Sequence, residues 1–415
     1  MDIYRARWII PVEGPPLEHG FLAVEQGRVA ALGPGEQIES LGASQATVHE
    51  LGDTVLLPGF VNAHTHLELT SYHDRLSPGP LWPWLEGLIA LRRREHAADL
   101  EAAGVRSGAA ASLDAGVTTV GDISRTGIAA AILKDSPLRK VCFVELISGA
   151  SQPPNDDASL KNVYENLLHL AEPDRLVIGI SPHAPYSVTE EDLKAATALA
   201  RTAGAPLTMH LLETREEARW LADGGGPMAD LILSHGLPRA AARFGGDFGA
   251  LLGCFAGLSG RQLLAHVNYL TDRQLDSLAA CGAGVAWCPR AHRFFGHAGH
   301  RWREMLARGI NVCIGTDSLA SNASLSILDE LRWLHRQVPD CPADLILEMG
   351  TLRGARGLGL DDLVGSLRPG KRADFVAVPW ESSGPTTAAA NLLESHAAVS
   401  HVWIDGRTAF PGTKP

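Results

Sequence analysis

The stretch Pro58-Gly59-Phe60-Val61-Asn62-Ala63-His64-Thr65-His66-Leu67-Glu68-Leu69 decides how the rest of the chain is interpreted. The small and apolar residues from Thr54 to Val61 predict a buried strand, interrupted only at Pro58-Gly59. Residues two apart in a strand point to the same side, so His64 and His66 direct both imidazoles toward one point. Neutral imidazole is a good ligand for divalent transition metals. A His-x-His pair alone is also compatible with two surface or core histidines, so the rest of the chain must decide.

The bulk composition predicts an ordinary globular protein. The chain has 415 residues, of which 45% are hydrophobic and 20% charged, enough for a large core and more than one structural unit. A net charge of -11 argues against nucleic acid or an anionic membrane as a partner. The six cysteines form no C-x-x-C pair and are expected to be reduced. Without a visible signal peptide or an apolar segment of about 20 residues, we expect a cytoplasmic protein.

The two ends of the chain resemble each other in pattern. Residues 1–57 predict short antiparallel strands, with Gln26-Gly27 as a hairpin turn. Strand patterns return in residues 366–415, where Asp405-Gly406 marks a turn. We therefore expect both ends to pack together as one small β-sandwich beside the central part.

Residues 58–365 have a different pattern, in which short apolar strands alternate with helical stretches such as Glu190–Ala203 and Asp272–Cys281. Together with the strand that ends at His64 and His66, eight strands are expected. Eight β–α repeats in about 300 residues predict a closed parallel barrel. A doubly wound open sheet is the alternative, although no glycine-rich phosphate loop supports it. The seven further strands are expected at residues 117–122, 140–146, 176–181, 206–210, 263–267, 284–289 and 311–317.

Catalytic groups of such barrels lie at the carboxyl ends of the strands. Those ends carry an unusual set of polar residues: His64, His66, His183, His210, His266 and Asp317. Three imidazoles and a carboxylate form a suitable ligand set for zinc or ferrous iron, with room left for water. The strand ends therefore favour a metal site over two isolated histidines.

Two further residues near these strand ends have both a functional and an ordinary interpretation. Glu213, three residues after His210, lies within reach of the predicted site as a proton shuttle, or it is a solvated acid at the start of a helix. His183 is bracketed by Pro182 and Pro185, which favours a rigid loop that points its ring toward the substrate. A capped-loop histidine without a function is the alternative for His183.

Six motifs occur in the order found in the amidohydrolase superfamily, and the chain most resembles its cytosine/adenosine-deaminase and chlorohydrolase-related branch. They are Pro-Gly-Phe-Val-Asn-Ala-His-Thr-His-Leu-Glu, Ser-Pro-His-Ala-Pro-Tyr-Ser, His-Leu-Leu-Glu-Thr, Leu-Leu-Ala-His, Trp-Cys-Pro-Arg and Gly-Thr-Asp-Ser-Leu-Ala-Ser-Asn. The tail from Gly365 to Phe375 resembles that family's return into the sandwich domain. The resemblance covers nearly the whole chain.

The resemblance implies a role for each matching residue. One divalent metal, zinc rather than iron, would be bound by His64, His66, His210 and Asp317. His266 would orient the attacking water or the developing oxyanion, Glu213 would relay protons, and Asp317 would also help to deprotonate the water. Two-metal relatives use a carboxylated lysine on the fourth strand, and residues 176–181 contain no lysine. We therefore expect one metal and the release of ammonia from an amino-substituted heterocycle of the purine or nucleoside type.

The substrate itself is less constrained by the sequence. Trp82–Glu86 and Ala90–Arg94 resemble the corresponding segment of aminodeoxyfutalosine deaminases, although they are also compatible with a packed and solvated helix. Relatives commonly carry Ser-Asn after the Cys288-Pro289 pair, whereas this chain has Arg290 and His292, which suit a pocket wall or a carboxylate-bearing substrate. The expected substrate contacts are His183, Glu68, Trp84, Arg290 and His292.

Two other classes of function are open alternatives, one catalytic and one not. A hydrolase that opens a cyclic amide or displaces a ring substituent would need the same metal site. A non-catalytic scaffold relative would be expected to have lost ligands, and none is missing here. We expect a small heterocyclic substrate as the partner, and a homo-oligomer is an open alternative to a monomer.

Overall fold

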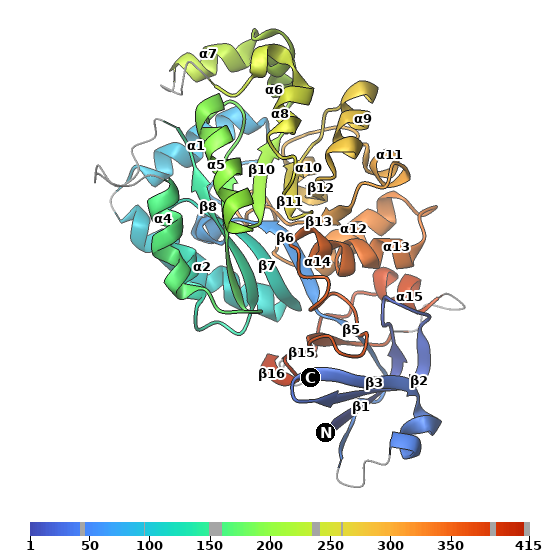
Figure 1. Cartoon of the computed structure of the whole chain (residues 1–415). Helices are drawn as coiled ribbons and strands as arrows, with labels where there is room; N and C mark the ends of the chain where they lie inside the picture. Colours follow the sequence, from blue (N-terminus) through green and yellow to red (C-terminus); the bar gives the residue numbers. More distant parts are fainter. Residues whose placement is uncertain are drawn as a thin grey trace.

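The computed structural model describes residues 1–41, 46–94, 96–148, 160–234, 241–258, 260–381 and 387–410. Eight parallel strands form its central barrel, in the order in which they occur along the chain (Figure 1). The barrel closes where the first strand meets the last: the carbonyl of His64 accepts hydrogen bonds from the backbone N–H groups of Thr316 and Asp317, both at 3.1 Å. The predicted closed barrel is confirmed. Its strands are β6 (Phe60–Thr65), β7 (Val117–Ser124), β8 (Arg139–Leu146), β9 (Leu176–Pro182), β10 (Leu207–Leu211), β11 (Gln262–His266), β12 (Gly284–Trp287) and β13 (Val312–Ile314).

Helices surround the barrel, and several begin where the sequence provides a cap. Thr189 accepts a hydrogen bond from Asp192 N at the start of α5. Thr271 and Gln274 form a reciprocal capping box at the start of α9. The helices are α1 (Leu81–Arg92), α2 (Ala97–Asp114), α3 (Ile128–Leu133), α4 (Leu160–Leu167), α5 (Glu190–Ala203), α6 (Arg215–Asp223), α7 (Pro227–Ser234), α8 (Phe248–Gly253), α9 (Asp272–Cys281), α10 (Pro289–Phe294), α11 (Trp302–Ala307), α12 (Ile327–Gln337), α13 (Ala343–Met349), α14 (Leu352–Gly357) and α15 (Ala388–Glu394).

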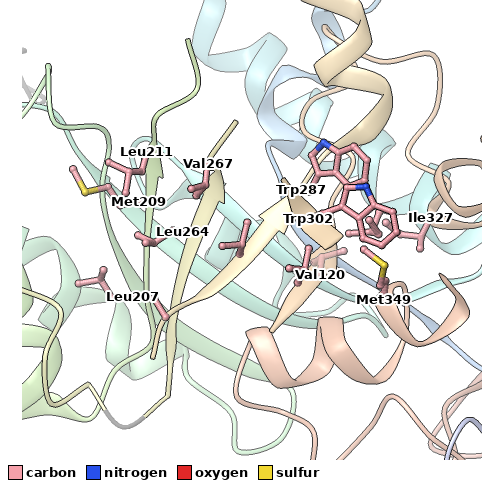
Figure 2. Packing of buried hydrophobic residues seen from close by; sticks show 14 of the residues in the cluster. Val120, Leu207, Met209, Leu211, Leu264, Val267, Trp287, Trp302, Ile327 and Met349 are labelled. Carbon is pink, nitrogen blue, oxygen red and sulfur yellow. The ribbon is translucent and has the colours of Figure 1, made fainter. Parts of the chain in front are cut away.

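The strand period of two separates the core from the site. On β10, Leu207, Met209 and Leu211 belong to the large apolar cluster between the strands and the surrounding helices, part of which is shown in Figure 2. His210, between them in the sequence, points to the other side of the strand. Trp287 and Trp302 stack within the same cluster, with ring centroids 6.0 Å apart. The apolar residues of each strand thus fix which residues face the barrel interior.

Both ends of the chain form a second sheet, which lies below the barrel in Figure 1. Its strands run β16-β15-β14-β5-β1-β2-β3, and β4 pairs with β1. Tyr4 in β1 and Trp403 in β15 have two strands between them, yet their ring centroids lie 5.3 Å apart. The sheet therefore curls around its own apolar cluster. Its strands are β1 (Asp2–Ile9), β2 (Leu17–Glu25), β3 (Arg28–Pro34), β4 (Thr47–Glu50), β5 (Thr54–Pro58), β14 (Phe375–Pro379), β15 (His401–Ile404) and β16 (Arg407–Phe410).

The predicted strand from Thr54 to Val61 is two strands in two different sheets. β5 pairs with β14 in the terminal sheet, and β6 begins the barrel. Gly59 lies at the switch, where a Cβ atom would come within 2.1 Å of Thr118 Oγ1, so a larger residue would collide with β7. The division of the chain into residues 1–57, 58–365 and 366–415 as domains stays a prediction.

Smaller expectations were also met. Gln26 and Gly27 have φ values of 51° and 74° and join β2 to β3 through the pair Glu25 and Arg28, as a tight hairpin requires. All six cysteines are free thiols. Among the described residues, no helix combines the length and the apolar character that crossing a membrane would need.

Candidate metal centre and active site

A cavity of about 470 Å³ lies at the carboxyl ends of the barrel strands, a size typical of small-molecule sites. His64 lies under its floor with 1% of its surface exposed. The structure thus brings together side chains from β6, β9, β10, β11 and β13 that are far apart in the sequence. The predicted residues that line the cavity are His66, Trp84, His183, His210, Glu213, His266 and Asp317.

Three histidines converge with metal-binding geometry, since ligand nitrogens of His64, His66 and His210 lie within 4.8 Å of one another. The Nε2 atoms of His66 and His210 lie 3.2 Å apart. Asp317 Oδ1 lies 3.6 Å from His66 Nε2 and 3.9 Å from His64 Nε2. Ligand atoms bound to zinc at about 2.0–2.1 Å in a tetrahedron lie roughly 3.3 Å from one another. The spacing of the three histidines, with Asp317 beside two of them, therefore suits a single divalent ion.

Hydrogen bonds around the candidate ligands leave the atoms that would bind a metal available. His210 Nδ1 donates to the carbonyl of His183 at 3.0 Å, which leaves a lone pair on Nε2. Ser321 Oγ donates to Asp317 Oδ2 at 2.7 Å, so Oδ1 is the oxygen that faces the histidines. His64 Nε2 is buried without a hydrogen-bond partner. A buried nitrogen without a partner is costly, and a bound metal would satisfy it.

The protonation states also favour metal binding. Burial, and then the neighbouring imidazoles, hold the pKa of His64 and His66 well below the ordinary value of 6.5. Burial lowers the pKa of His210 to about 4. These rings are therefore neutral at pH 7, which is the form that binds metals. Burial raises the pKa of Asp317 to about 6, so this carboxyl can exchange a proton near neutral pH.

Glu213 and His266 form a pair beside the ligand cluster, with Glu213 Oε1 3.7 Å from His266 Nε2. Burial, and then Asp317 and Glu217, raise the pKa of Glu213 well above its ordinary value, so this side chain is suited to carry a proton. His266 and Asp317 have φ values of 69° and 58°, a left-handed conformation that is uncommon for non-glycine residues. Such backbone conformations concentrate at functional sites.

The remaining predicted substrate contacts differ in position. Trp84 lines the cavity and donates from Nε1 to the carbonyl of Ala320 at 3.2 Å. Glu68 lies outside the cavity lining, because its carboxylate is engaged with Ser124, at 2.5 Å, and Arg92, at 3.1 Å.

Arg290 and His292 also lie outside the cavity lining. Arg290 donates from Nη1 to Ser324 at 3.0 Å, and its backbone N–H donates to Glu330 at 3.0 Å. His292 Nδ1 is 3.1 Å from Asn268 Oδ1. These partners keep both side chains in the wall behind the site, so we do not include Arg290, His292 or Glu68 among the proposed substrate contacts.

The cavity also contains residues that the sequence did not single out. Glu145, at the end of β8, lines it, as do Tyr186, Arg93 and Arg125. The end of the predicted strand 140–146 is a usable signal for Glu145, because other barrel strands carry their candidate His and Asp residues at the same end. Arg125 directly follows β7, so the strand end was a usable signal for it as well, whereas Arg93 follows α1, where strand-end reasoning gives no guidance.

The family of the chain follows from comparison with known proteins. The model of the amidohydrolase family matches residues 55–409. The chain belongs to the amidohydrolase family. It is therefore a metal-dependent hydrolase that acts on carbon–nitrogen bonds other than peptide bonds.

Individual amidohydrolases resemble the whole chain. The 5-methylthioadenosine/S-adenosylhomocysteine deaminase of Moorella thermoacetica is 32% identical over 402 residues, which cover 93% of this chain and 88% of that protein. The protein of that name from Nitratidesulfovibrio vulgaris (strain Miyazaki F) is 32% identical over 398 residues, 93% of this chain and 83% of that one.

Two solved structures share the fold over 98% of this chain. An adenosine deaminase from Xanthomonas campestris with bound zinc has a TM-score of 0.81 and 25% identity, with 92% of that chain covered. The aminofutalosine deaminase of Helicobacter pylori in complex with methylthio-coformycin has a TM-score of 0.85 and 24% identity, with 100% of that chain covered. The second likeness concerns the fold alone.

Proposed function

We propose that this amidohydrolase is a hydrolytic deaminase that releases ammonia from an amino-substituted heterocycle of a purine nucleoside, with zinc as its metal. The observation that carries the proposal is the joint position of the three histidines, Asp317 and the pair Glu213 and His266 in one cavity. The names of the relatives from Moorella and Nitratidesulfovibrio support a nucleoside substrate.

The residues divide the proton transfers between them. A divalent ion held by His64, His66, His210 and Asp317 would supply Lewis-acid activation of water. Asp317 accepts a proton from the attacking water, and His266 orients the water or the developing oxyanion. Glu213 donates a proton to the ring nitrogen next to the attacked carbon. Asp317 passes its proton to the exocyclic amine, the hydroxyl proton goes to Glu213, and the tetrahedral carbon collapses with release of ammonia.

The wall of the cavity suits a flat ring with polar substituents. Trp82 and Trp84 from α1 and Tyr186 after β9 provide apolar surface, and His183 is held beside them. Burial lowers the pKa of His183 to about 4, so its ring is neutral at pH 7 and can form a hydrogen bond with a hydroxyl of the substrate.

Ammonia release by the zinc-loaded protein tests the proposal. The panel is 5-methylthioadenosine, S-adenosylhomocysteine, adenosine, aminodeoxyfutalosine, guanine and cytosine. We expect release from an adenine nucleoside with the ring otherwise intact, loss of release after chelation, and recovery when zinc is added back. Recovery with ferrous iron but not zinc would contradict the choice of metal. Silence across the panel with metal bound would contradict deamination and favour hydrolysis of a cyclic amide or a ring substituent.

A further inference from the structure

Glu145 is a buried carboxylate in the cavity that the proposed chemistry does not use. It lies at the carboxyl end of β8, one strand before the loop that carries His183, and 6% of its surface is exposed. The backbone N–H of His183 donates to the carbonyl of Leu146 at 2.9 Å, so the loop of His183 is fixed against the end of β8. Glu145 and His183 thus form one side of the cavity.

The carboxylate of Glu145 has no protein partner among the described residues, which give it neither a hydrogen bond nor an ion pair. Ring nitrogens of His183 and His210 lie within 4.8 Å of a carboxylate oxygen of Glu145 and of each other. Burial raises the pKa of Glu145 above its ordinary value, and His210, Arg92 and Arg125 act against that effect. A buried carboxylate without partners is costly unless a ligand supplies donors.

The neighbouring histidines do not supply those donors in the tautomer that the proposal uses. When the hydroxyl proton of Ser187 is donated to the carbonyl of Ala184, Ser187 Oγ accepts from His183 Nδ1–H at 2.6 Å. In this tautomer His183 Nε2 presents a lone pair to the cavity. His210 donates from Nδ1 to the carbonyl of His183 and directs Nε2 toward His66. Glu145 and His183 are thus two hydrogen-bond acceptors side by side.

Two adjacent acceptors select a particular kind of ligand group. An anion is excluded by repulsion from the carboxylate. A second metal ion would need His210 as its third ligand, yet one nitrogen of that ring is bonded to a carbonyl and the other belongs to the first metal site. A group with neighbouring O–H donors satisfies both acceptors, and a carboxylate can take two hydroxyls at once.

We propose that Glu145 is a specificity-determining residue that accepts hydrogen bonds from the sugar hydroxyls of a nucleoside, with His183 Nε2 accepting from a neighbouring donor of the same molecule. The inference rests on the proposed function, because the sugar is placed next to a ring that lies against His66 and His210. Glu145 would thus make the site select ligands that carry a sugar, in addition to the heterocyclic ring.

Binding of two deamination products tests the subsite without turnover. Inosine has both sugar hydroxyls, and 2′,3′-dideoxyinosine lacks them. We expect the zinc-loaded protein to bind inosine about 10- to 100-fold more tightly in calorimetric titrations, the range expected for hydrogen bonds to a charged group. Glu145→Gln, which keeps the shape of the side chain, should remove most of this preference. Glu165→Gln, an exposed change on the helix after β8, should keep it.

Each outcome decides between the alternatives. A wild-type ratio retained in the Glu145→Gln variant, or no binding of inosine by the wild type, would overturn the subsite. Two zinc ions per chain that become one in the Glu145→Gln variant would overturn it in favour of a second metal site. A lost ratio without ammonia release from the panel would keep the subsite and contradict the deaminase. Ammonia release from the panel, together with a ratio of inosine to 2′,3′-dideoxyinosine binding that Glu145→Gln leaves unchanged, would support the deaminase and contradict the subsite.

Discussion

Asp317 has two proposed roles, as a metal ligand and as the base that accepts a proton from water. Substituting this residue is therefore the most informative single change. Its Oδ1 atom faces the histidines, and Ser321 holds its Oδ2 atom. Asparagine keeps the shape and the contact with Ser321 but cannot accept the proton of water. We expect Asp317→Asn to lower kcat/KM for ammonia release by about 1,000-fold or more, the upper range for acid–base catalysis.

Folding and activity must be measured together for this variant. Circular dichroism should be unchanged, because the Asp317→Asn substitution is isosteric. Asp276→Asn removes an exposed carboxylate from α9 and serves as the matched control, with activity expected to remain near that of the wild type. Near-normal turnover by the Asp317→Asn variant would rule out its role as base.

Titration of His292 should change the free energy of unfolding with pH. It is 9% exposed, and burial, followed by His300 and His297, lowers its pKa to about 3. In the unfolded chain its pKa returns to about 6.5, so between pH 3 and 6.5 unfolding takes up a proton. The free energy of unfolding should therefore fall as pH falls through this window.

The measurement compares the slope of unfolding free energy against pH for the wild type and His292→Gln. Glutamine can still pair with Asn268 but does not titrate. We expect the slope of the variant between pH 4 and 6 to be smaller by up to about one proton. His401→Gln, in the terminal sheet, is the control, and equal slopes for the His292→Gln variant and the wild type would contradict the prediction.

At the scale of elements, the turn from β10 into α6 positions Glu213. The two carboxylate oxygens of Glu217 accept from the backbone N–H groups of Leu212 and Glu213, both at 2.9 Å. Asn268 donates to the carbonyl of Glu213 at 2.9 Å. Leu212 has a φ of 51°, so the chain needs these bonds to hold an uncommon conformation. Glu217 is therefore a positioning residue for the proton carrier.

Glu217→Gln should leave one of the two N–H groups unpaired. We expect a loss of about 1–3 kcal/mol in stability and a kcat lowered by about 10- to 100-fold with KM within about threefold, because a small displacement of Glu213 affects the transition state more than binding. Glu216→Gln, next to it in the same helix, is the control. A raised KM with unchanged kcat would assign Glu217 to substrate binding instead.

The elements show where prediction from sequence succeeds and where it stops. The eight barrel strands follow from apolar runs, and His64 with His66 follows from the strand period, because both are local patterns. The partners of Arg290 and Glu68 are not local: Glu330 lies 40 residues beyond Arg290, and Ser124 lies 56 residues beyond Glu68. The sequence alone therefore could not show that these charged side chains have partners within the protein.

At the scale of the whole molecule, β8 connects the terminal sheet to the site. Arg139 begins this strand with 1% of its surface exposed, and Glu145 ends it in the cavity. Arg139 donates to both oxygens of Asp374, at 2.6 and 3.1 Å, and pairs with Asp405 after β15. It also donates to the carbonyl of Asp174, which precedes β9, at 2.6 Å. One guanidinium thus joins two barrel strands to the sheet formed by the chain ends.

Removing this guanidinium tests how strongly the terminal sheet supports the barrel. Arg139→Met keeps much of the volume but leaves Asp374 buried without its cation, which typically costs about 3–5 kcal/mol. We expect a correspondingly lower denaturant midpoint. Asp374→Asn in the same chain should recover part of the loss, because it removes the unpaired charge. Arg303→Met, which breaks an exposed pair with Asp340, should barely move the midpoint.

The activity of the Arg139→Met variant separates support of the fold from support of the site. Arg139 and the cavity lie at opposite ends of β8, so the part of the sample that remains folded should keep kcat/KM within about threefold of the wild type when measured well below the unfolding transition. An unchanged midpoint would mean that the buried ion pair contributes little and that apolar packing alone holds the sheet to the barrel. A normal midpoint with lost activity would mean that the position of β8, and with it Glu145 and His183, depends on the terminal sheet. The expected result, lower stability with intact chemistry, follows because a buried charge without a partner destabilises the folded state as a whole and does not act on the distant strand end.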